Sequence, residues 1–255
     1  MSHRKEEGIS GELVSKLFSL AIKPESIGEN PLTEDEILAL FRARDAVWLH
    51  GGDPKKPHAE LTSGKCSNGY FNCSKILCFP SFAEILAWHL VYKLREQGIK
   101  PGTIDWVIGS PYAAITFSYK VAELLGAVHG FPEKDPTVVP TDPKGKRMLW
   151  KRWQIPKGAK VLRIEELITT LGTTMSVRQA VKRGNSEPVE FSSVVGTLVH
   201  RPPKLPISYA ELRIVALVEK EVWAVEPSKC PLCKAGSKRL KPKSNWAELT
   251  GKEGG

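Results

Sequence analysis

The feature that most constrains the fold is an apolar run followed by two carboxylates, a Thr and Gly loop, and a helix. The run starts at Val161 and leads to Glu165 and Glu166. Such a run is typical of a buried strand in a parallel sheet, and we expect the strand to end at the carboxylates. The loop that follows is Thr169, Thr170, Leu171, Gly172 and Thr173. Residues 175–181 then predict a helix.

A strand, a Thr and Gly loop and a helix N-terminus together form an anion site. Loop amides and hydroxyls point at a phosphate, and the helix dipole favours its negative charge. Glu165 and Glu166 cannot serve that phosphate directly. They suit hydroxyl groups or a hard cation such as Mg²⁺, which takes oxygen ligands. The alternative is an ordinary strand, loop and helix of an α/β domain.

This stretch resembles the phosphoribosyl-pyrophosphate signature of type I phosphoribosyltransferases. Glu165 and Glu166 match its acidic pair, and residues 169–173 match its Thr-Thr-Gly-Gly-Ser type loop. The resemblance implies that the carboxylates are catalytic and that the loop binds the substrate phosphate. Two positions depart from the signature. Leu171 replaces a glycine and tolerates positive φ poorly, and both acidic residues are Glu where the family has at least one Asp.

Residues 58–78 predict short strands broken by Ser-Gly and Asn-Gly turns. They also resemble the N-terminal hood of orotate phosphoribosyltransferases, through Leu61-Thr62-Ser63-Gly64-Lys65 and Tyr70-Phe71-Asn72. The resemblance implies that the base is bound by Lys65, Tyr70, Phe71 and Asn72. An aromatic ring can stack on a base while amides and a cation satisfy its polar edges. A plain hairpin with core aromatics is the alternative.

Two further segments carry the same resemblance. Residues 109–114 match the pyrophosphate loop, which implies contacts of Ser110 and Tyr112 with the diphosphate, but Ala113 stands where the family has Lys. Residues 132–145 are polar and Pro-rich, as in a mobile active-site loop. The family's loop is basic, and we expect Lys146 and Arg147 to be catalytic. The candidates for the basic cover are Lys134, Lys144, Lys146, Arg147, Lys151 and Arg152.

The remaining periodicity predicts helices over 11–20, 34–49, 80–97 and 113–125, and strands over 105–108, 126–131, 189–199 and 212–218. Thr33 and Glu36 form a capping box at the second helix. Alternating strands and helices predict an α/β fold, a mostly parallel sheet flanked by helices, with an N-terminal hood. The expected organisation is a helical extension (1–57), a phosphoribosyltransferase-like domain (58–225, hood 58–78) and a basic tail (226–255).

Charge and composition narrow the functional class. The 255-residue chain carries a net charge of +9, and residues 144–163 hold eight basic and no acidic residues. This clustering fits the binding of phosphates or another polyanion, or else a solvated basic face. No apolar run is long enough to span a membrane, and the charged N-terminus has no signal core behind it. We therefore expect a cytoplasmic protein.

The five cysteines are an odd count and do not suggest a secreted disulfide framework. Cys230 and Cys233 form a Cys-x-x-Cys, which is half of a structural zinc site. Cys66, Cys73 and Cys78 could add ligands only if they lie nearby. A reduced knuckle without metal is the alternative.

Together the resemblances imply an enzyme that joins orotate to phosphoribosyl pyrophosphate, with Mg²⁺ as cofactor and a homodimer as assembly. Mg²⁺ would be held through the substrate, with no direct side-chain ligand. Two alternatives stay open: a non-catalytic regulator that binds phosphoribosyl pyrophosphate, and a phosphoribosyltransferase for another base. We do not expect nucleic acid as a partner, because the first 50 residues contain no convincing helix-turn-helix.

Overall fold

The centre of the molecule is a five-stranded sheet in which every neighbouring pair is parallel. The computed structural model describes residues 31–137 and 147–252, so the helix expected over 11–20 lies outside the described residues. The strand order is β11-β10-β9-β5-β6. Their bounds are β5 Trp106–Gly109, β6 Val128–Gly130, β9 Lys160–Ile168, β10 Glu190–His200 and β11 Arg213–Glu219. This topology confirms the predicted α/β fold.

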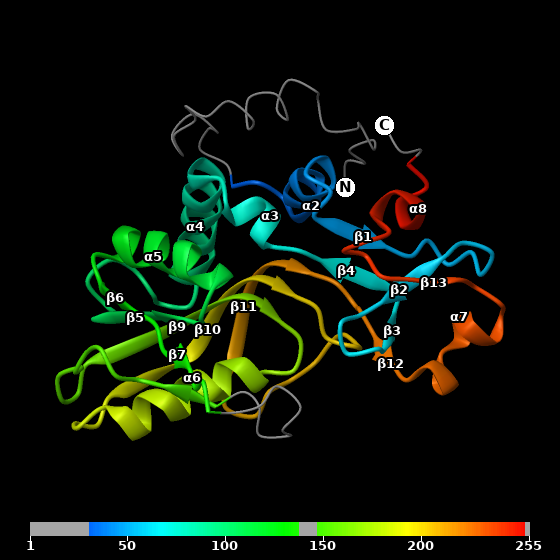
Figure 1. Cartoon of the computed structure of the whole chain (residues 1–255). Coiled ribbons are helices and arrows are strands. Elements are labelled where there is room, and N and C mark those ends of the chain that lie inside the picture. The colour runs from blue at the N-terminus through cyan, green and yellow to red at the C-terminus, as the bar shows by residue number, and fades with distance from the viewer. Residues whose placement is uncertain (1–30, 138–146, 253–255) are drawn as a thin grey trace.

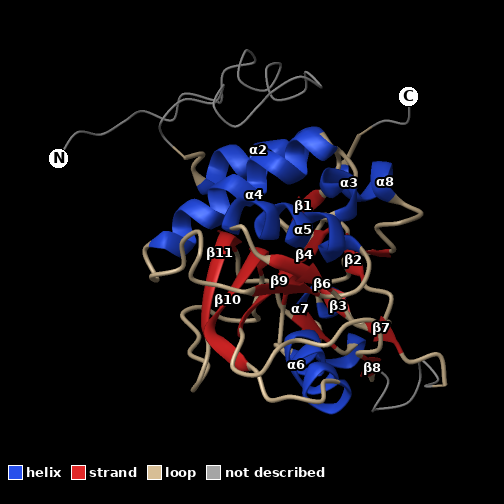
Figure 2. Cartoon of the chain, turned by 90° about the vertical axis from the view of Figure 1, so that its left-hand side faces the viewer, coloured by secondary structure: helices blue, strands red, loops and turns tan. Residues whose placement is uncertain are grey.

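Helices cover both faces of this sheet (Figure 1). Helices α2, α4 and α5 lie on one face and α6 on the other, which Figure 2 shows from the side. Their bounds are α2 Glu34–Ala43, α4 Pro80–Arg95, α5 Ala113–Leu125 and α6 Gly172–Gly184. Their placement makes a three-layer arrangement in which both sheet faces are covered, as all-parallel sheets require.

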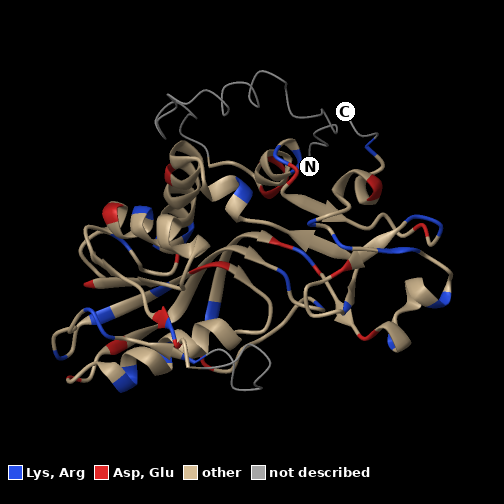
Figure 3. Cartoon of the chain, viewed as in Figure 1, with Lys and Arg blue, Asp and Glu red and all other residues tan. Residues whose placement is uncertain are grey.

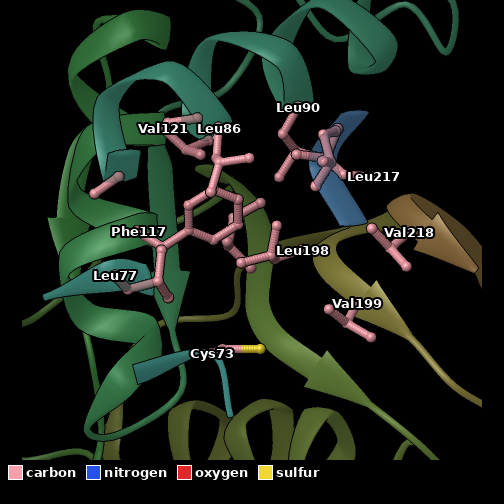
Figure 4. Packing of buried hydrophobic residues seen from close by; sticks show 14 of the residues in the cluster. Cys73, Leu77, Leu86, Leu90, Phe117, Val121, Leu198, Val199, Leu217 and Val218 are labelled. Atoms are coloured by element: carbon pink, nitrogen blue, oxygen red, sulfur yellow. The ribbon is translucent and has the colours of Figure 1, made fainter. Parts of the chain in front are cut away.

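Two hydrophobic cores follow from the layers. In the larger core, the ring of Phe117 from α5 is fully buried and lies between the residues of α4 and Leu198 of β10 (Figure 4). In the smaller core, Val177 and Val181 of α6 pack with Trp150 and Val161. The β9 residues alternate between the two cores, and this alternation fixes which way each β9 side chain points.

A second group of short strands forms the hood beside the main sheet. Strand β1 pairs with β4, and the other strands form a sheet in the order β12-β3-β2-β13. The bounds are β1 Val47–Leu49, β2 His58–Glu60, β3 Cys66–Ser67, β4 Gly69–Phe71, β12 Ala224–Val225 and β13 Arg239–Leu240. Because β12 and β13 come from the end of the chain, the tail completes the hood.

The remaining elements are short. A ribbon of two antiparallel strands, β7 (Glu133–Lys134) and β8 (Met148–Leu149), flanks the gap in the described residues. The others are α3 Ser74–Leu77, the 3₁₀ turn Pro227–Lys229, α7 Pro231–Lys234 and α8 Trp246–Thr250. Within the described residues, no helix is long and apolar enough to cross a membrane.

Two predicted boundaries were wrong. The capping box of Thr33 and Glu36 is present, but the helix ends at Ala43, because Asp45 has φ +51° and the chain then enters β1. Strand β9 does not end at the carboxylates; it continues through them to Ile168, where β10 still pairs with it. In addition, α2 packs into the main core.

Candidate active site

The carboxyl ends of the parallel strands gather three loops at one edge of the sheet. Ser110 follows β5, Thr169 follows β9 and Arg201 follows β10. Backbone hydrogen bonds hold the loops to the neighbouring strands, from Ser110 N to Ile164 O (3.3 Å) and from Arg201 N to Ile168 O (2.8 Å). Ligands of open α/β sheets bind at this edge, so the predicted phosphate and diphosphate loops lie at the expected place.

Glu165 and Glu166 are neighbours near the end of β9, and Ser110 of the loop after β5 interacts with both carboxyls. The Glu165 side chain is 2% exposed, and its Oε2 accepts no hydrogen bond from the described residues. Burial raises the pKa of Glu165 to about 7. Burial also raises the pKa of Glu166, whose Oε2 accepts a 3.1 Å hydrogen bond from Ser110 Oγ. Burial therefore disfavours the ionised form of both carboxyls, and a polar ligand that donates hydrogen bonds to them would stabilise that form.

The loop after β9 has the geometry of an anion site. Residues 167–174 line a small hollow, and no side chain caps the N-terminus of α6, which begins at Gly172. The first amides of a helix lack intrahelical partners and carry the positive end of its dipole. Leu171 adopts φ +56°, in the left-handed region. The loop therefore keeps a backbone conformation that favours glycine, although Leu occupies the position.

The loop after β5 is held by close packing. A Cβ on Gly109 would lie 2.1 Å from Ser118 Oγ, so a side chain has no room there. Tyr112 has φ +72° and is 67% exposed, and Ala113 begins α5. The Nζ of Lys134 lies 4.4 Å from the centre of the Tyr112 ring. A cation from β7 thus lies beside the loop that lacks the family's Lys.

Two arginines beside the ribbon make ion pairs with nearby acidic residues. Arg147 Nε lies 3.2 Å from Asp135 Oδ2, and Arg152 pairs with Glu133. Lys144 and Lys146 lie outside the described residues. The predicted catalytic roles of Lys146 and Arg147 therefore stay predictions.

The four hood residues lie in different surroundings. Tyr70 lines a cavity of about 300 Å³ together with Leu61, Thr62 and tail residues Lys241–Ser244. Phe71 is 6% exposed and packs edge-on against Phe41, so its ring belongs to the core.

Lys65 forms a 3.4 Å ion pair with Glu226 of the tail. Asn72 is half-buried, and its backbone N–H donates a hydrogen bond to the Ala46 carbonyl. Figure 3 shows Lys and Arg recurring along the tail segment that runs beside β2. Of the four hood residues predicted to bind the base, Tyr70 is the one that lines the cavity. Lys241 and Lys243 of the tail line the same cavity.

Arg201 is a site residue that the sequence analysis treated only as part of a loop. Burial lowers the pKa of its guanidinium, and nearby Cys73 and Tyr70 partly offset this effect. Its Nε is buried and has no hydrogen-bond partner among the described residues. Cys73 Sγ in turn donates to the Glu166 carbonyl. Arg201 thus places a cation close to Tyr70 and Cys73, with an Nε that has no partner among the described residues. The signal for it was its position directly after a parallel strand.

Comparisons with known proteins agree with this geometry. No protein-family model matches the chain. Two curated relatives, both named orotate phosphoribosyltransferase, are 33% identical over 213 residues, which is 84% of this chain and 98% of each relative. They come from Desulforamulus reducens and Pelotomaculum thermopropionicum.

A solved structure, the UMP synthase of Leishmania donovani, aligns with a TM-score of 0.51 at 18% identity. The alignment covers 76% of this chain and 38% of that one, so the chain spans well under half of that structure. At this identity the likeness supports the fold alone.

Proposed function

This chain belongs to the orotate phosphoribosyltransferase family, and on that premise we propose that it joins orotate to phosphoribosyl pyrophosphate, giving orotidine monophosphate and pyrophosphate. The observation that carries the proposal is the meeting of three features at one sheet edge. These are the carboxylates of the buried Glu165 and the half-buried Glu166, the uncapped N-terminus of α6, and the loop of residues 110–112. A ribose carrying phosphate at one end and diphosphate at the other needs these three kinds of contact.

The 5′-phosphate binds at residues 169–173, where loop amides, hydroxyls and the α6 dipole all favour an anion. The diphosphate binds at Ser110 and Tyr112, and Lys134 supplies the cation that Ala113 does not. Lys134 comes from a different segment of the chain than the family's Lys, but it serves the same requirement, which is positive charge beside the leaving group.

Glu165 and Glu166 accept hydrogen bonds from the ribose hydroxyls. Positive charge develops at the anomeric carbon when the diphosphate leaves, and fixed carboxylates nearby stabilise it more in the transition state than in the ground state. No covalent nucleophile is needed, because positioning and electrostatics supply the rate. Ser110 holds the Glu166 carboxylate through its hydroxyl.

Mg²⁺ fits the oxygen atoms at this place, since Oε2 of Glu165 has no hydrogen-bond partner among the described residues and the Ser110 hydroxyl lies at the Glu166 carboxylate. Glu165 and Glu166 would hold the ion indirectly, by hydrogen bonds to the ribose hydroxyls of the substrate. When bound, the ion would neutralise charge on the diphosphate leaving group.

Orotate binds on the hood side of the edge. Its carboxylate suits the half-buried Arg201, whose buried Nε has no hydrogen-bond partner among the described residues, and charge-assisted bonds of this kind are strong. Its planar ring suits the exposed part of Tyr70. These contacts favour a base that carries a carboxylate over adenine or another neutral base.

The test is to incubate the full chain with phosphoribosyl pyrophosphate and Mg²⁺ and measure pyrophosphate release with orotate, uracil and adenine. We expect release with orotate and little with the neutral bases. If pyrophosphate is released with another base and not with orotate, that base is the substrate. Binding of phosphoribosyl pyrophosphate without nucleotide formation from any base would favour the regulator, for which Ala113 and Leu171 already argue.

We also propose that the enzyme acts in the cytoplasm as a homodimer. Support for the compartment is that all five cysteines are free thiols, as reducing conditions keep them. Support for the dimer is the family resemblance of the basic loop, which often reaches across a dimer. Light scattering on the purified chain measures its mass in solution. The mass of a monomer would contradict the proposed homodimer.

A further inference from the structure

We propose that His58, Cys66, Cys230 and Cys233 bind one structural zinc ion that fastens the C-terminal tail to the hood. The ligand atoms of these four residues all lie within 4.8 Å of one another. Three of the side chains are buried and Cys233 is half-buried. The cluster lies in the hood sheet, away from the acidic pair, and the catalytic proposal does not use it.

The distances match a tetrahedral ion. Cys66 Sγ lies 3.5 Å from Cys233 Sγ, and His58 Nε2 lies 3.6 Å from Cys230 Sγ and 3.4 Å from Cys233 Sγ. With zinc bonds of about 2.3 Å to sulfur and 2.0 Å to nitrogen, a tetrahedron has edges of about 3.8 Å between sulfurs and about 3.5 Å between nitrogen and sulfur. Three of the six separations are therefore close to the edges of a zinc tetrahedron, and the other three are at most 4.8 Å.

The thiols are too far apart to be a disulfide, whose sulfurs lie about 2.05 Å apart, and all are free. The sequence spacing also fits. Cys230 precedes α7 as its N-cap, and its Sγ accepts a hydrogen bond from the Cys233 amide (3.4 Å). An amide that donates to a sulfur favours the thiolate form, which is the metal ligand.

A hydrogen bond to Ser237 orients the histidine. Ser237 Oγ donates to Lys56 O (2.6 Å) and lies 2.8 Å from His58 Nδ1. A hydroxyl has one proton, and here it is used on the Lys56 carbonyl, so Ser237 must accept the Nδ1 hydrogen. His58 Nε2 then carries the lone pair, and it faces the sulfurs. Metal-binding histidines are held in this way, with the other ring nitrogen donating to a fixed acceptor.

The place of the cluster explains what the ion would do. Its ligands come from two parts of the chain that are 172 residues apart. The hydrophobic cluster there is small, with Cys66, Cys230 and Leu232 as its only buried members among the described residues. So few apolar contacts hold a tail weakly, and small units of this kind gain their stability from a metal. The held tail brings Lys241 and Lys243 to the hood cavity.

The test is metal analysis of the full chain, expressed in zinc-supplemented medium and purified without chelator. We expect about one zinc per chain, with the content falling roughly tenfold or more in the Cys230→Ser/Cys233→Ser variant. Cys78→Ser is the matched control, because Cys78 is exposed and outside the cluster, and it should keep the full content. His58→Cys should also keep zinc, as a four-thiolate site.

Cobalt substitution gives a second readout, on the wild-type chain and on the Cys78→Ser control. Tetrahedral cobalt with thiolate ligands has intense visible bands, and we expect them in the wild type and in Cys78→Ser. Ser237→Ala should weaken metal affinity by about 10- to 100-fold, because His58 Nδ1 loses the hydroxyl that accepts its hydrogen.

The absence of both zinc and the cobalt spectrum from a folded wild-type chain would overturn the proposal. A disulfide between two of the three cysteines in the freshly purified protein, with no metal, would overturn it as well. Neither result depends on catalytic activity, so the zinc proposal and the proposed function fail separately.

Discussion

The hydroxyl of Ser110 donates a 3.1 Å hydrogen bond to Oε2 of Glu166, so the loop after β5 and strand β9 are joined by their side chains. This contact makes Glu166 the anchored carboxylate, whereas Oε2 of the neighbouring Glu165 accepts no hydrogen bond from the described residues. Two adjacent carboxylates with different surroundings should behave differently when a ligand binds.

The first prediction is that Glu165→Gln and Glu166→Gln differ in effect. At least one should lower turnover more than it weakens the binding of phosphoribosyl pyrophosphate, on the order of tenfold or more in kcat, because its contact is stronger in the transition state. Steady-state formation of orotidine monophosphate, beside equilibrium binding, measures both quantities. Equal losses in turnover and binding for both variants would contradict a transition-state role.

The second prediction concerns the phosphate loop. Thr173→Val keeps the side-chain volume and removes a hydroxyl donor, which should weaken the binding of phosphoribosyl pyrophosphate by about 1–3 kcal/mol. Calorimetry measures the change. Thr250→Val makes the same substitution on α8 and should leave affinity unchanged. If Thr173→Val binds as tightly as the wild type, residue 173 does not contact the phosphate.

The third prediction concerns the left-handed backbone at Leu171, which has φ +56°. This conformation costs an L-residue about 1–2 kcal/mol, and a β-branched side chain tolerates it least. Leu171→Gly should therefore be nearly neutral, since relief of strain offsets the entropy that glycine loses. Leu171→Val should be less stable than both. Urea unfolding ranks the three proteins, and a glycine variant less stable than the valine variant would exclude strain at this position.

The fourth prediction separates two cations. Arg201→Ala should weaken orotate binding by about 1.5–3 kcal/mol, the value of a buried hydrogen bond to a charged group, and leave the binding of pyrophosphate unchanged. Lys134→Ala should do the reverse, with an effect of about 1 kcal/mol because Lys134 is exposed. Calorimetric titration of each variant with each ligand gives four affinities. If both variants weaken the same ligand, the assignment of the two cations is wrong.

How much of this site could be predicted depends on how local each signal is. Glu165, Glu166 and the loop up to Thr173 form one continuous stretch, so a strand, a loop and a helix start were enough to locate them. The end of β9 could not be located, because pairing with β10, a partner more than 20 residues away, extends the strand through both carboxylates.

Contacts between distant segments were beyond sequence reasoning. Cys230 and Cys233 stood out as half of a zinc site, and Cys66, Cys73 and Cys78 were possible further ligands. Only the pairing of β12 and β13 with the hood sheet selects Cys66 among these three and adds His58. A lone His or Cys carries no signal until the fold supplies its neighbours. The same holds for Lys134, whose position beside Tyr112 depends on the ribbon.

The last prediction uses the burial of Glu165 to relate stability to pH. Burial raises the pKa of this carboxyl from 4.5 to about 7 in the folded chain. Between these values the unfolded chain has released the proton while the folded chain still holds it. The free energy of unfolding therefore falls as pH rises through this window, since the folded state binds more protons. The contribution of Glu165 is fully present below pH 4.5 and lost by about pH 7, and it amounts to on the order of 1–3 kcal/mol.

Glu165→Gln cannot ionise, so this variant should lose less stability than the wild type between pH 5 and pH 7.5, as measured by urea unfolding. Glu96→Gln, an exposed residue at the end of α4, should follow the wild-type curve and serves as control. Phosphoribosyl pyrophosphate should reduce the wild-type pH dependence, because ribose hydroxyls stabilise the ionised carboxylate. Parallel curves for the wild type and Glu165→Gln would mean that Glu165 is already ionised in the folded chain, with the neighbouring buried guanidinium of Arg163 as its counter-charge.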